Sequence, residues 1–500
     1  MIDNEKIKKH FFKNKLTLIY LISLMLYTLI IFYCNGFNYS KINLILITIT
    51  FIVGFIILKF SLKSEKDIHK IALLYLLIFG LIIAFTSPIF VVPDEVEHFA
   101  RSDLTSEGVL FPQYTPNQGY YMNNYFWDML YNAGLTIFNA NLTHWDIWDA
   151  QAFFESAFSQ NLFYGYIAQA IGILLAKILD LSVIWTLWLG RVFNLIFYSL
   201  IVYVSIRNIP KFKYELLFLA CLPLAIFQAA SMSVDGFIFA MAILNFSYFI
   251  RLYYSKKEFD PKDLAIFFIS GLLIGLLKMP YIFILLLIFL LPKNKFKSKN
   301  YCLLLNLISL LLIGIAMIYS YKYASPELLK SGRALIMAQN NVSVSGQINY
   351  MLNNPLNATL TLIKSVGGSI YTIFIYELKL YSEKYVNGYI LFNLLILIIF
   401  FIVSLLSPSK FKKKERLYMF FVFMVIYVSI FLIQFLSWSP VGGNEILGIQ
   451  ARYFVPILPL IPLIIGKGYC KKIKDYNHIL LMCITLVLSA TLILTFIGFY

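Results

Sequence analysis

The sequence predicts an all-α, polytopic integral membrane protein with about thirteen transmembrane helices. Of its 500 residues, 60% are hydrophobic and only 13% are charged, which is too little charge to cover the surface of a soluble protein of this length. The hydrophobic residues also come in long runs, such as 15–34 and 42–60. Each run has about the ~20 residues that cross a hydrocarbon core as a helix, where the backbone must satisfy its own hydrogen bonds.

The basic residues lie in short clusters between the hydrophobic runs. These clusters hold 29 of the 41 Lys and Arg residues, at 6–15, 59–70, 207–213, 251–262, 293–299, 410–416 and 467–474. A net charge of +16 would also suit a nucleic-acid-binding protein, but basic clusters between apolar spans follow the positive-inside rule and contact anionic inner-leaflet lipid. We therefore predict a multi-pass plasma-membrane protein with a cytoplasmic N-terminus, membrane lipid as a partner, and no nucleic-acid binding.

Placing every basic cluster inside fixes the predicted path of the chain. The predicted spans lie at 15–34, 42–60, 69–87, 183–206, 214–230, 236–254, 263–277, 279–292, 302–321, 388–407, 417–436, 453–467 and 478–499. The span at 279–292 is short, which indicates a tilted or broken helix. Residues 1–68 then form an N-terminal transmembrane hairpin, and residues 69–500 form the main transmembrane domain.

Two long segments, 88–182 and 322–387, fall on the extracytoplasmic side of this path. The first holds ten acidic residues, which only Arg101 and Lys177 oppose. Within these segments the apolar stretches 163–178 and 358–376 either span the membrane or lie along its outer interface. We expect short interfacial helices, because a crossing at 163–178 would place a basic cluster outside.

The densest polar cluster follows the third predicted span and comprises Asp94, Glu95, Glu97, His98 and Arg101. If the segment after Pro93 is helical, Asp94, His98 and Arg101 share one face. The two basic side chains would then keep the Asp94 carboxylate ionised. The alternative is an ordinary helix N-terminus, in which a proline and dipole-favoured acids precede solvated charges.

Two further charged residues lie in or beside predicted spans. Asp235 sits at the turn between two spans, where it either caps the following helix or has a functional role. Arg191 lies inside a predicted span, and a charge at that depth needs a partner or a water-filled cavity.

A third candidate site is the run Gln450-Ala451-Arg452-Tyr453, at the outer mouth of the twelfth predicted span. Arg452 either extends its side chain to lipid headgroups or holds a phosphate, for which a guanidinium fork is well shaped.

An ordered set of motifs resembles the bacterial membrane family known as domain of unknown function 2142. The matching runs are Pro93-Asp94-Glu95 with His98, Phe99, Arg101, Glu107 and Gly108; residues 166–172; residues 189–194; Pro223 with residues 227–235; residues 438–442; and residues 448–456. This sequence departs from the family pattern at Val92 and Val96, where prolines are common, and at Ala451, where glycine is common. Two spans also precede the usual first span.

That family looks like a branch of the GT-C glycosyltransferases. The resemblance implies a polyprenyl-phosphate sugar donor and catalysis on the outer face. We therefore predict a glycosyltransferase that acts on a cell-envelope glycan, with Asp94 and Glu95 as catalytic residues. The residues predicted to bind the donor or substrate are His98, Arg101, Arg191, Asp235, Gln450, Arg452 and Tyr453.

The chemistry of such a transfer agrees with these residue types. An acceptor hydroxyl needs a base, for which Asp94 is the first candidate, and the departing phosphate needs positive charge. A divalent cation is a possible cofactor, held by Asp94 and Glu95. Two other function classes stay open. One is a lipid-linked glycan transporter or flippase, which the charged Arg191 inside a predicted span favours. The other is a glycan polymerase or ligase.

Overall fold

The computed structural model describes residues 4–64, 67–116, 118–123, 125–140, 151–156, 158, 161–324, 337–375, 388–469, 473 and 475–500. Within these ranges, nine helices are long and apolar enough to cross a membrane. They are α1 (Asn4–Cys34), α2 (Lys41–Lys63), α3 (Ile68–Thr86), α7 (Ile184–Asn208), α10 (Asp235–Tyr253), α12 (Lys299–Tyr319, extended by the π-helical turn Ser320–Ala324), α17 (Tyr389–Leu406), α18 (Lys413–Ser437) and α20 (Tyr476–Phe499). The prediction of a helical, multi-pass membrane protein is confirmed.

The remaining predicted spans are shorter or broken elements. Residues 214–230 form two helices, α8 (Lys213–Ala220) and α9 (Pro223–Ala229), in place of one. Pro223 explains the break, because it has no N–H to continue α8 and favours the first position of a new helix. The others are α11 (Pro261–Leu277), the 3-10 helix η2 (Met279–Leu290) with the short η3 (Lys293–Lys295), the 3-10 helix η5 (Ala451–Leu460), and α19 (Ile461–Ile465).

The two long 3-10 helices gain length from their geometry. A 3-10 helix rises about 2.0 Å per residue against about 1.5 Å in an α-helix, so η2 extends over roughly 24 Å and η5 with α19 over roughly 27 Å. In the second case Pro456 and Pro459 lie three residues apart within η5, which places them on one face of a helix with three residues per turn. The short predicted span at 279–292 is therefore an elongated 3-10 segment.

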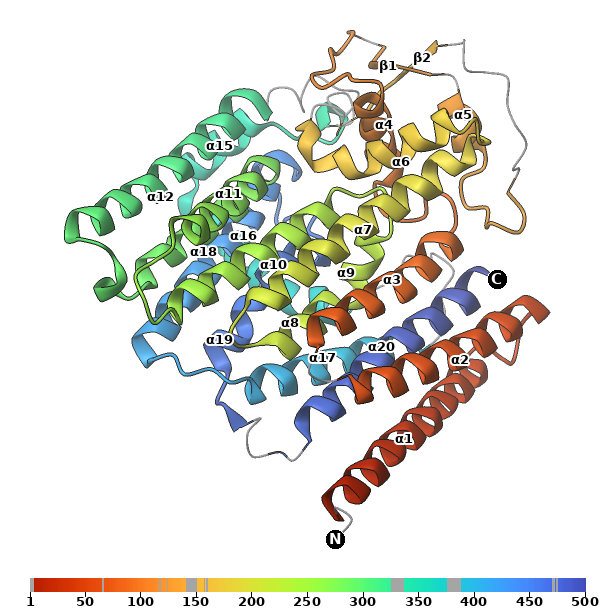
Figure 1. Cartoon of the computed structure of the whole chain (residues 1–500). Coiled ribbons are helices and arrows are strands. Elements are labelled where there is room, and N and C mark those ends of the chain that lie inside the picture. Colours follow the sequence, from red (N-terminus) through yellow and green to blue (C-terminus); the bar gives the residue numbers. More distant parts are fainter. Residues whose placement is uncertain are drawn as a thin grey trace.

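Smaller elements gather at the end of the bundle opposite the N-terminus (Figure 1). They are α4 (Glu95–Ser106), α5 (Tyr125–Tyr131), the 3-10 helix η1 (Phe163–Tyr166), α6 (Ile167–Ile178), α15 (Val344–Asn353) and the nearby α16 (Pro355–Ile375). Strands β1 (Tyr120–Asn123) and β2 (Gln151–Phe154) pair antiparallel, with Tyr120 opposite Phe154. This two-stranded sheet is a small departure from the all-α prediction.

The stretch 163–178 forms η1 and α6, and α6 packs closely against α7. A Cβ on Gly172 would come within 2.3 Å of the Leu189 carbonyl oxygen, so only glycine permits this approach. The opposite face exposes Ile167, Ile171 and Ile178. Together η1 and α6 extend over roughly 26 Å, about as long as η2, so the interfacial placement of this stretch rests on the basic clusters and not on its length. The stretch 358–376 lies in α16 except for residue 376, which is outside the described residues.

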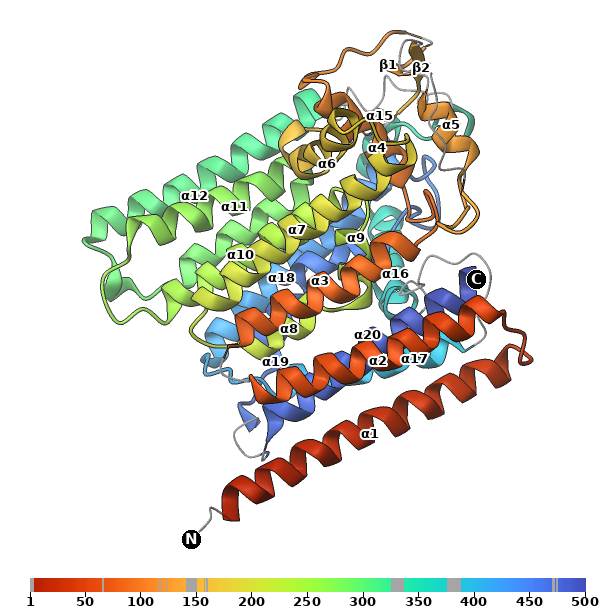
Figure 2. The same ribbon diagram turned by 45° about the vertical axis from the view of Figure 1, so that its right-hand side comes forward.

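The N-terminal helices α1 and α2 pack against α20 at one edge of the bundle (Figure 2). The Tyr20 hydroxyl lies 2.9 Å from Ser489 Oγ, and Asn43 Nδ2 donates to the Phe496 carbonyl at 2.8 Å. Gly54 of α2 faces Tyr20 so closely that an added Cβ would stand 1.9 Å from its hydroxyl oxygen. The contact between α1 and α2 therefore depends on the missing side chain of Gly54.

We expect Gly54→Ala to destabilise the protein, because an extra methyl group in a packed contact costs about 1–3 kcal/mol. Thermal unfolding of the purified protein in detergent measures the effect. The matched control is Gly314→Ala in α12, where no atom lies within 4 Å of the new Cβ. Equal melting temperatures for the two variants would contradict this packing.

Candidate functional site

Four helical elements begin at one place and bring four charged side chains together. Asp94 precedes α4, Asp235 is the first residue of α10, Lys278 precedes η2, and Arg452 is the second residue of η5. Ion pairs join them, as Arg452 contacts both Asp94 and Asp235, and Lys278 contacts Asp235. A helix N-terminus carries a partial positive charge, so four of them surround this cluster with a field that favours anions.

Arg452 lies at the centre of the cluster, with only 4% of its side chain exposed. One terminal nitrogen pairs with the Asp94 carboxylate, and Nη1 donates to the Pro93 carbonyl at 3.1 Å. Nε stands 3.5 Å from Asp235 Oδ2. The predicted run around Arg452 therefore meets the predicted Asp94 segment, 358 residues away in the sequence.

The residues on either side of Arg452 shape its surroundings. Gln450 precedes η5, and its carbonyl accepts the Tyr453 N–H at 3.0 Å. The Tyr453 ring lies beside both cations, with its centroid 4.8 Å from Lys278 Nζ and 5.6 Å from Arg452 Cζ. The Tyr281 hydroxyl donates to the Tyr453 carbonyl at 2.8 Å, which fixes η5 against η2.

Asp94 adopts a left-handed backbone conformation, with φ 61° and ψ 14°. Aspartate tolerates this region better than most residues. The helix begins one residue later, at Glu95, and the Asp94 side chain makes no capping hydrogen bond. Its carboxylate instead turns toward Arg452 and is 28% exposed. The prediction that Asp94 lies on one helical face with His98 and Arg101 is therefore wrong, because Asp94 precedes the helix.

His98 and Arg101 are buried residues of α4 that pack it against neighbouring segments. His98 Nδ1 lies 2.9 Å from the Tyr166 hydroxyl, and its ring stacks on Phe158. Burial lowers the pKa of His98 to about 3, so the ring is neutral near pH 7 and cannot supply the predicted positive charge beside Asp94. Arg101 donates to the carbonyls of Asn161 and Leu110, at 2.7 and 2.8 Å, and so fastens the surrounding loops.

Glu95 and Arg191 form a fully buried ion pair, with both side chains 0% exposed. Arg191 Nε and Nη2 contact the two Glu95 oxygens at 2.8 and 2.7 Å. The remaining guanidinium donors reach the carbonyls of Ala84, Ser87 and Pro88 at 2.8–3.0 Å. This geometry favours a structural role for both residues over the predicted catalytic and substrate-binding roles.

Asp94 and Glu95, the two carboxylates predicted to hold a divalent cation, do not point to one site. Each carboxylate is engaged by its own guanidinium, Asp94 by Arg452 and Glu95 by Arg191. Among the residues that the structure describes, no group of three or more His, Cys, Asp or Glu side chains could hold a metal ion. Asp94 and Glu95 therefore do not fit a shared metal.

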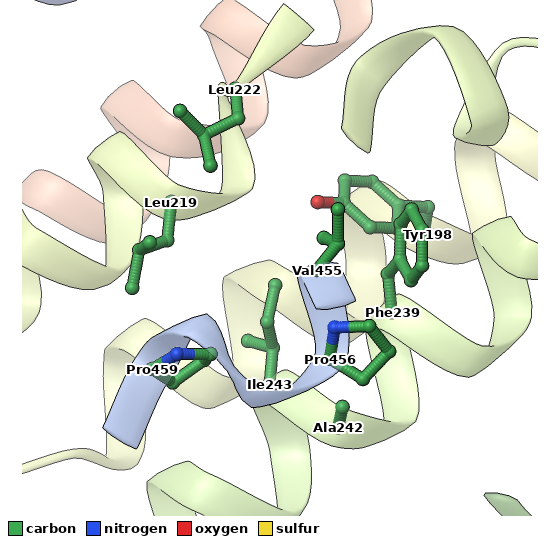
Figure 3. A pocket seen from close by; sticks show the side chains of 9 residues that line it. All are labelled: Tyr198, Leu219, Leu222, Phe239, Ala242, Ile243, Val455, Pro456 and Pro459. Carbon is green, nitrogen blue, oxygen red and sulfur yellow. The ribbon is translucent and has the colours of Figure 1, made fainter. Parts of the chain in front are cut away.

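An apolar cavity lies one to two helical turns beyond the cluster, along α10 and η5 (Figure 3). Its lining is Tyr198, Leu219, Leu222, Phe239, Ala242, Ile243, Val455, Pro456 and Pro459. The Tyr198 hydroxyl donates to the Ala220 carbonyl at 3.0 Å, so this polar group is already satisfied. The cavity offers no charged group to a sugar or phosphate, and the charged cluster remains the candidate site.

Lys278 belongs to the cluster, although it is not among the residues predicted to form a site. Its Nζ lies 2.5 Å from Asp235 Oδ1, and burial lowers the pKa of Lys278. Asp235 is 1% exposed and contacts two cations, so its side chain does not cap α10. One sequence signal pointed to Lys278, since it is the only charged residue from 264 to 292, and a lone charge in an apolar stretch indicates function.

We expect Arg191→Met to prevent stable folding, because breaking a buried ion pair leaves an uncompensated charge and costs about 3–5 kcal/mol. Thermal unfolding and yield of monodisperse protein measure the loss. The double variant Glu95→Gln/Arg191→Met removes both charges and should recover part of that stability. A fully stable Arg191→Met protein would contradict the structural role.

Comparison with known proteins bears on this arrangement. Residues 77–461 match the model of a family described as "Predicted membrane protein (DUF2142)", that is, domain of unknown function 2142. The match includes all four charged residues of the cluster and leaves out α1, α2 and α20. The chain matches no curated protein and no solved structure. Because the match extends over well more than half of the chain, the resemblance is confirmed, and the protein belongs to this family of membrane proteins.

Proposed function

We propose that this protein is a membrane glycosyltransferase that moves a sugar from a polyprenyl-phosphate donor to a cell-envelope glycan. The observation that carries the proposal is the partly exposed Asp94 carboxylate beside the buried Arg452, where four helix N-termini meet. A candidate base, Asp94, and a candidate anion-binding residue, Arg452, are in direct contact. Sugar transfer from a lipid phosphate requires that combination.

The donor phosphate binds at Arg452. A guanidinium presents a planar fork of N–H donors that matches phosphate oxygens, and the surrounding helix N-termini add partial positive charge. In the cluster as described, the Asp94 and Asp235 carboxylates face this guanidinium. An incoming phosphate would take the place of the Asp94 carboxylate and release it for chemistry.

Asp94 acts as the general base. It takes the proton of the acceptor hydroxyl, whose oxygen forms a bond to the anomeric carbon of the sugar. The bond from that carbon to the phosphate oxygen breaks, and polyprenyl phosphate leaves with the electron pair. The neighbouring Arg452 cation stabilises the phosphate as its negative charge grows.

The finer topology is part of the same proposal. The basic clusters support thirteen crossings, a cytoplasmic N-terminus and a GT-C-like arrangement with the site on the outer face of the plasma membrane. The lengths of η2 and of η5 with α19 support counting each as a crossing, since both approach the hydrocarbon thickness. A lipid donor also requires a site at the bilayer edge.

A flippase is the main alternative, and Arg191 is the residue that favours it. Its guanidinium is enclosed by Glu95 and three backbone carbonyls, so it does not line a path for a substrate. The transferase is therefore the proposal that the described contacts support best.

We expect Asp94→Asn to lower sugar transfer by about 10²–10⁴-fold, the usual cost of losing a general base. Donor binding should persist, because Arg452 remains. The test is a transfer assay with purified protein and a polyprenyl-phosphate sugar, run beside a thermal-stability measurement.

The matched control for Asp94 is Glu97→Gln, which removes a carboxylate from the first turn of the same helix. It should transfer at close to the normal rate. A normal rate in Asp94→Asn would move the base elsewhere. A wild-type protein that transfers no polyprenyl-phosphate sugar would contradict the proposed function itself.

The predicted extracytoplasmic position of the segment 88–182 can be tested by cysteine labelling. We expect Tyr131→Cys, in a background without the five native cysteines, to react with a membrane-impermeant thiol reagent in intact cells. Tyr131 is 91% exposed on α5. The control is Lys414→Cys in a basic cluster, which should react only after lysis. The reverse pattern would overturn the topology.

A further inference from the structure

Lys278 occupies a sharp junction between two helices. Its N–H donates to the Ile274 carbonyl at 2.9 Å and closes α11, while its own carbonyl accepts the Tyr281 N–H at 3.1 Å and opens η2. Between these bonds the backbone is extended, with φ −140° and ψ 102°. This break turns the side chain away from both helix axes and toward the start of α10.

Lys278 has the more exposed side chain of the two cationic residues in the cluster. Its side chain is 28% exposed, against 4% for Arg452. An ammonium has three N–H donors, and the hydrogen bond that the structure gives it goes to Asp235 Oδ1. The Tyr453 ring covers another side, with 4.8 Å from Nζ to the ring centroid. With one donor bonded to Asp235, the ammonium has further N–H donors for a ligand.

Asp235 holds the two cations at a fixed spacing. Oδ1 contacts Lys278, and Oδ2 stands 3.5 Å from Arg452 Nε but accepts no hydrogen bond. The loop before Asp235 is itself fastened, because Asn194 Nδ2 donates to the carbonyls of Ser231 and Ser233, at 2.8 and 3.1 Å. One buried carboxylate therefore sets the distance between an ammonium and a guanidinium.

We propose that Lys278 is a second phosphate-binding residue, which contacts a non-bridging oxygen of the donor phosphate beside Arg452, and that Asp235 is the positioning residue for both cations. This inference rests on the proposed function. A sugar phosphodiester carries one negative charge, and the polyprenyl phosphate that leaves carries up to two. A cation already in place stabilises this added charge without reorganisation, so Lys278 acts on the rate as well as on binding.

The simpler role for Lys278 is to neutralise buried Asp235. The two roles differ in their pH dependence. Lys278 is surrounded by Asp235 of α10, Arg452 and Tyr453 of η5, Tyr281 of η2, and Asp94 and His98 at the start of α4. Burial lowers the pKa of Lys278 below its usual 10.5. If its ammonium binds phosphate, donor affinity is full at lower pH and falls as pH rises through that pKa.

The experiment measures the Kd of undecaprenyl phosphate for the full-length protein in phosphatidylcholine nanodiscs. We expect Lys278→Met to weaken binding by on the order of tenfold or more, and Lys278→Arg to stay within about threefold of wild type. The wild-type affinity should fall as pH rises through the lowered pKa of Lys278, whereas that of Lys278→Arg should stay flat because arginine keeps its charge.

Two further arms identify the group that is bound. Undecaprenol, which lacks phosphate, should bind wild type and Lys278→Met equally, and inorganic phosphate should compete with the lipid if the phosphate alone is recognised. The double variant Lys278→Met/Asp235→Asn removes both members of the pair and gives a folded comparison if Lys278→Met is unstable. It should bind the lipid more weakly than Lys278→Met alone, because Asp235 also positions Arg452.

Unchanged undecaprenyl phosphate binding by Lys278→Met, or equal pH profiles for wild type and Lys278→Arg, would overturn the inference and leave Arg452 as the phosphate ligand. A wild-type protein that binds no undecaprenyl phosphate would instead contradict the proposed function.

Discussion

The buried ion pair between Glu95 and Arg191 is the interaction on which the charged cluster depends. Removing two charges from water is expensive, and the cost is recovered only when every donor and acceptor is satisfied. Here three carbonyls at the end of α3 accept from Arg191, and the Met232 N–H donates to Glu95 Oε1 at 3.1 Å. The pair thus joins the end of α3, the start of α4, the middle of α7 and the loop before α10.

This connection explains how two acids far apart in the sequence come to share one guanidinium. Asp94 directly precedes Glu95, and Asp235 follows Met232 by three residues, so fixing Glu95 fixes both. Arg452 then enters from η5, and Lys278 from the start of η2. The helix starts around the cluster lower the electrostatic cost of bringing an anion into a partly buried site.

The sequence predicted the long helices well, because an apolar run of about 20 residues has few other structures available in lipid. It also singled out Asp94, Asp235 and Arg452. It could not show that Arg191 faces Glu95, since 96 residues separate them. Nor could periodicity reveal that Asp94 lies outside α4, because that depends on one left-handed φ angle. The 3-10 geometry of η2 was equally hidden, as its run of apolar residues suits either helix type.

The most direct test of the central claim is an experimental structure of the protein with undecaprenyl phosphate in a lipid nanodisc. The account predicts phosphate density within hydrogen-bonding distance of both Arg452 and Lys278, with the Asp94 carboxylate moved off the guanidinium and the Glu95–Arg191 pair intact. Phosphate bound away from these two cations, or an Asp94–Arg452 contact unchanged in the bound state, would contradict it.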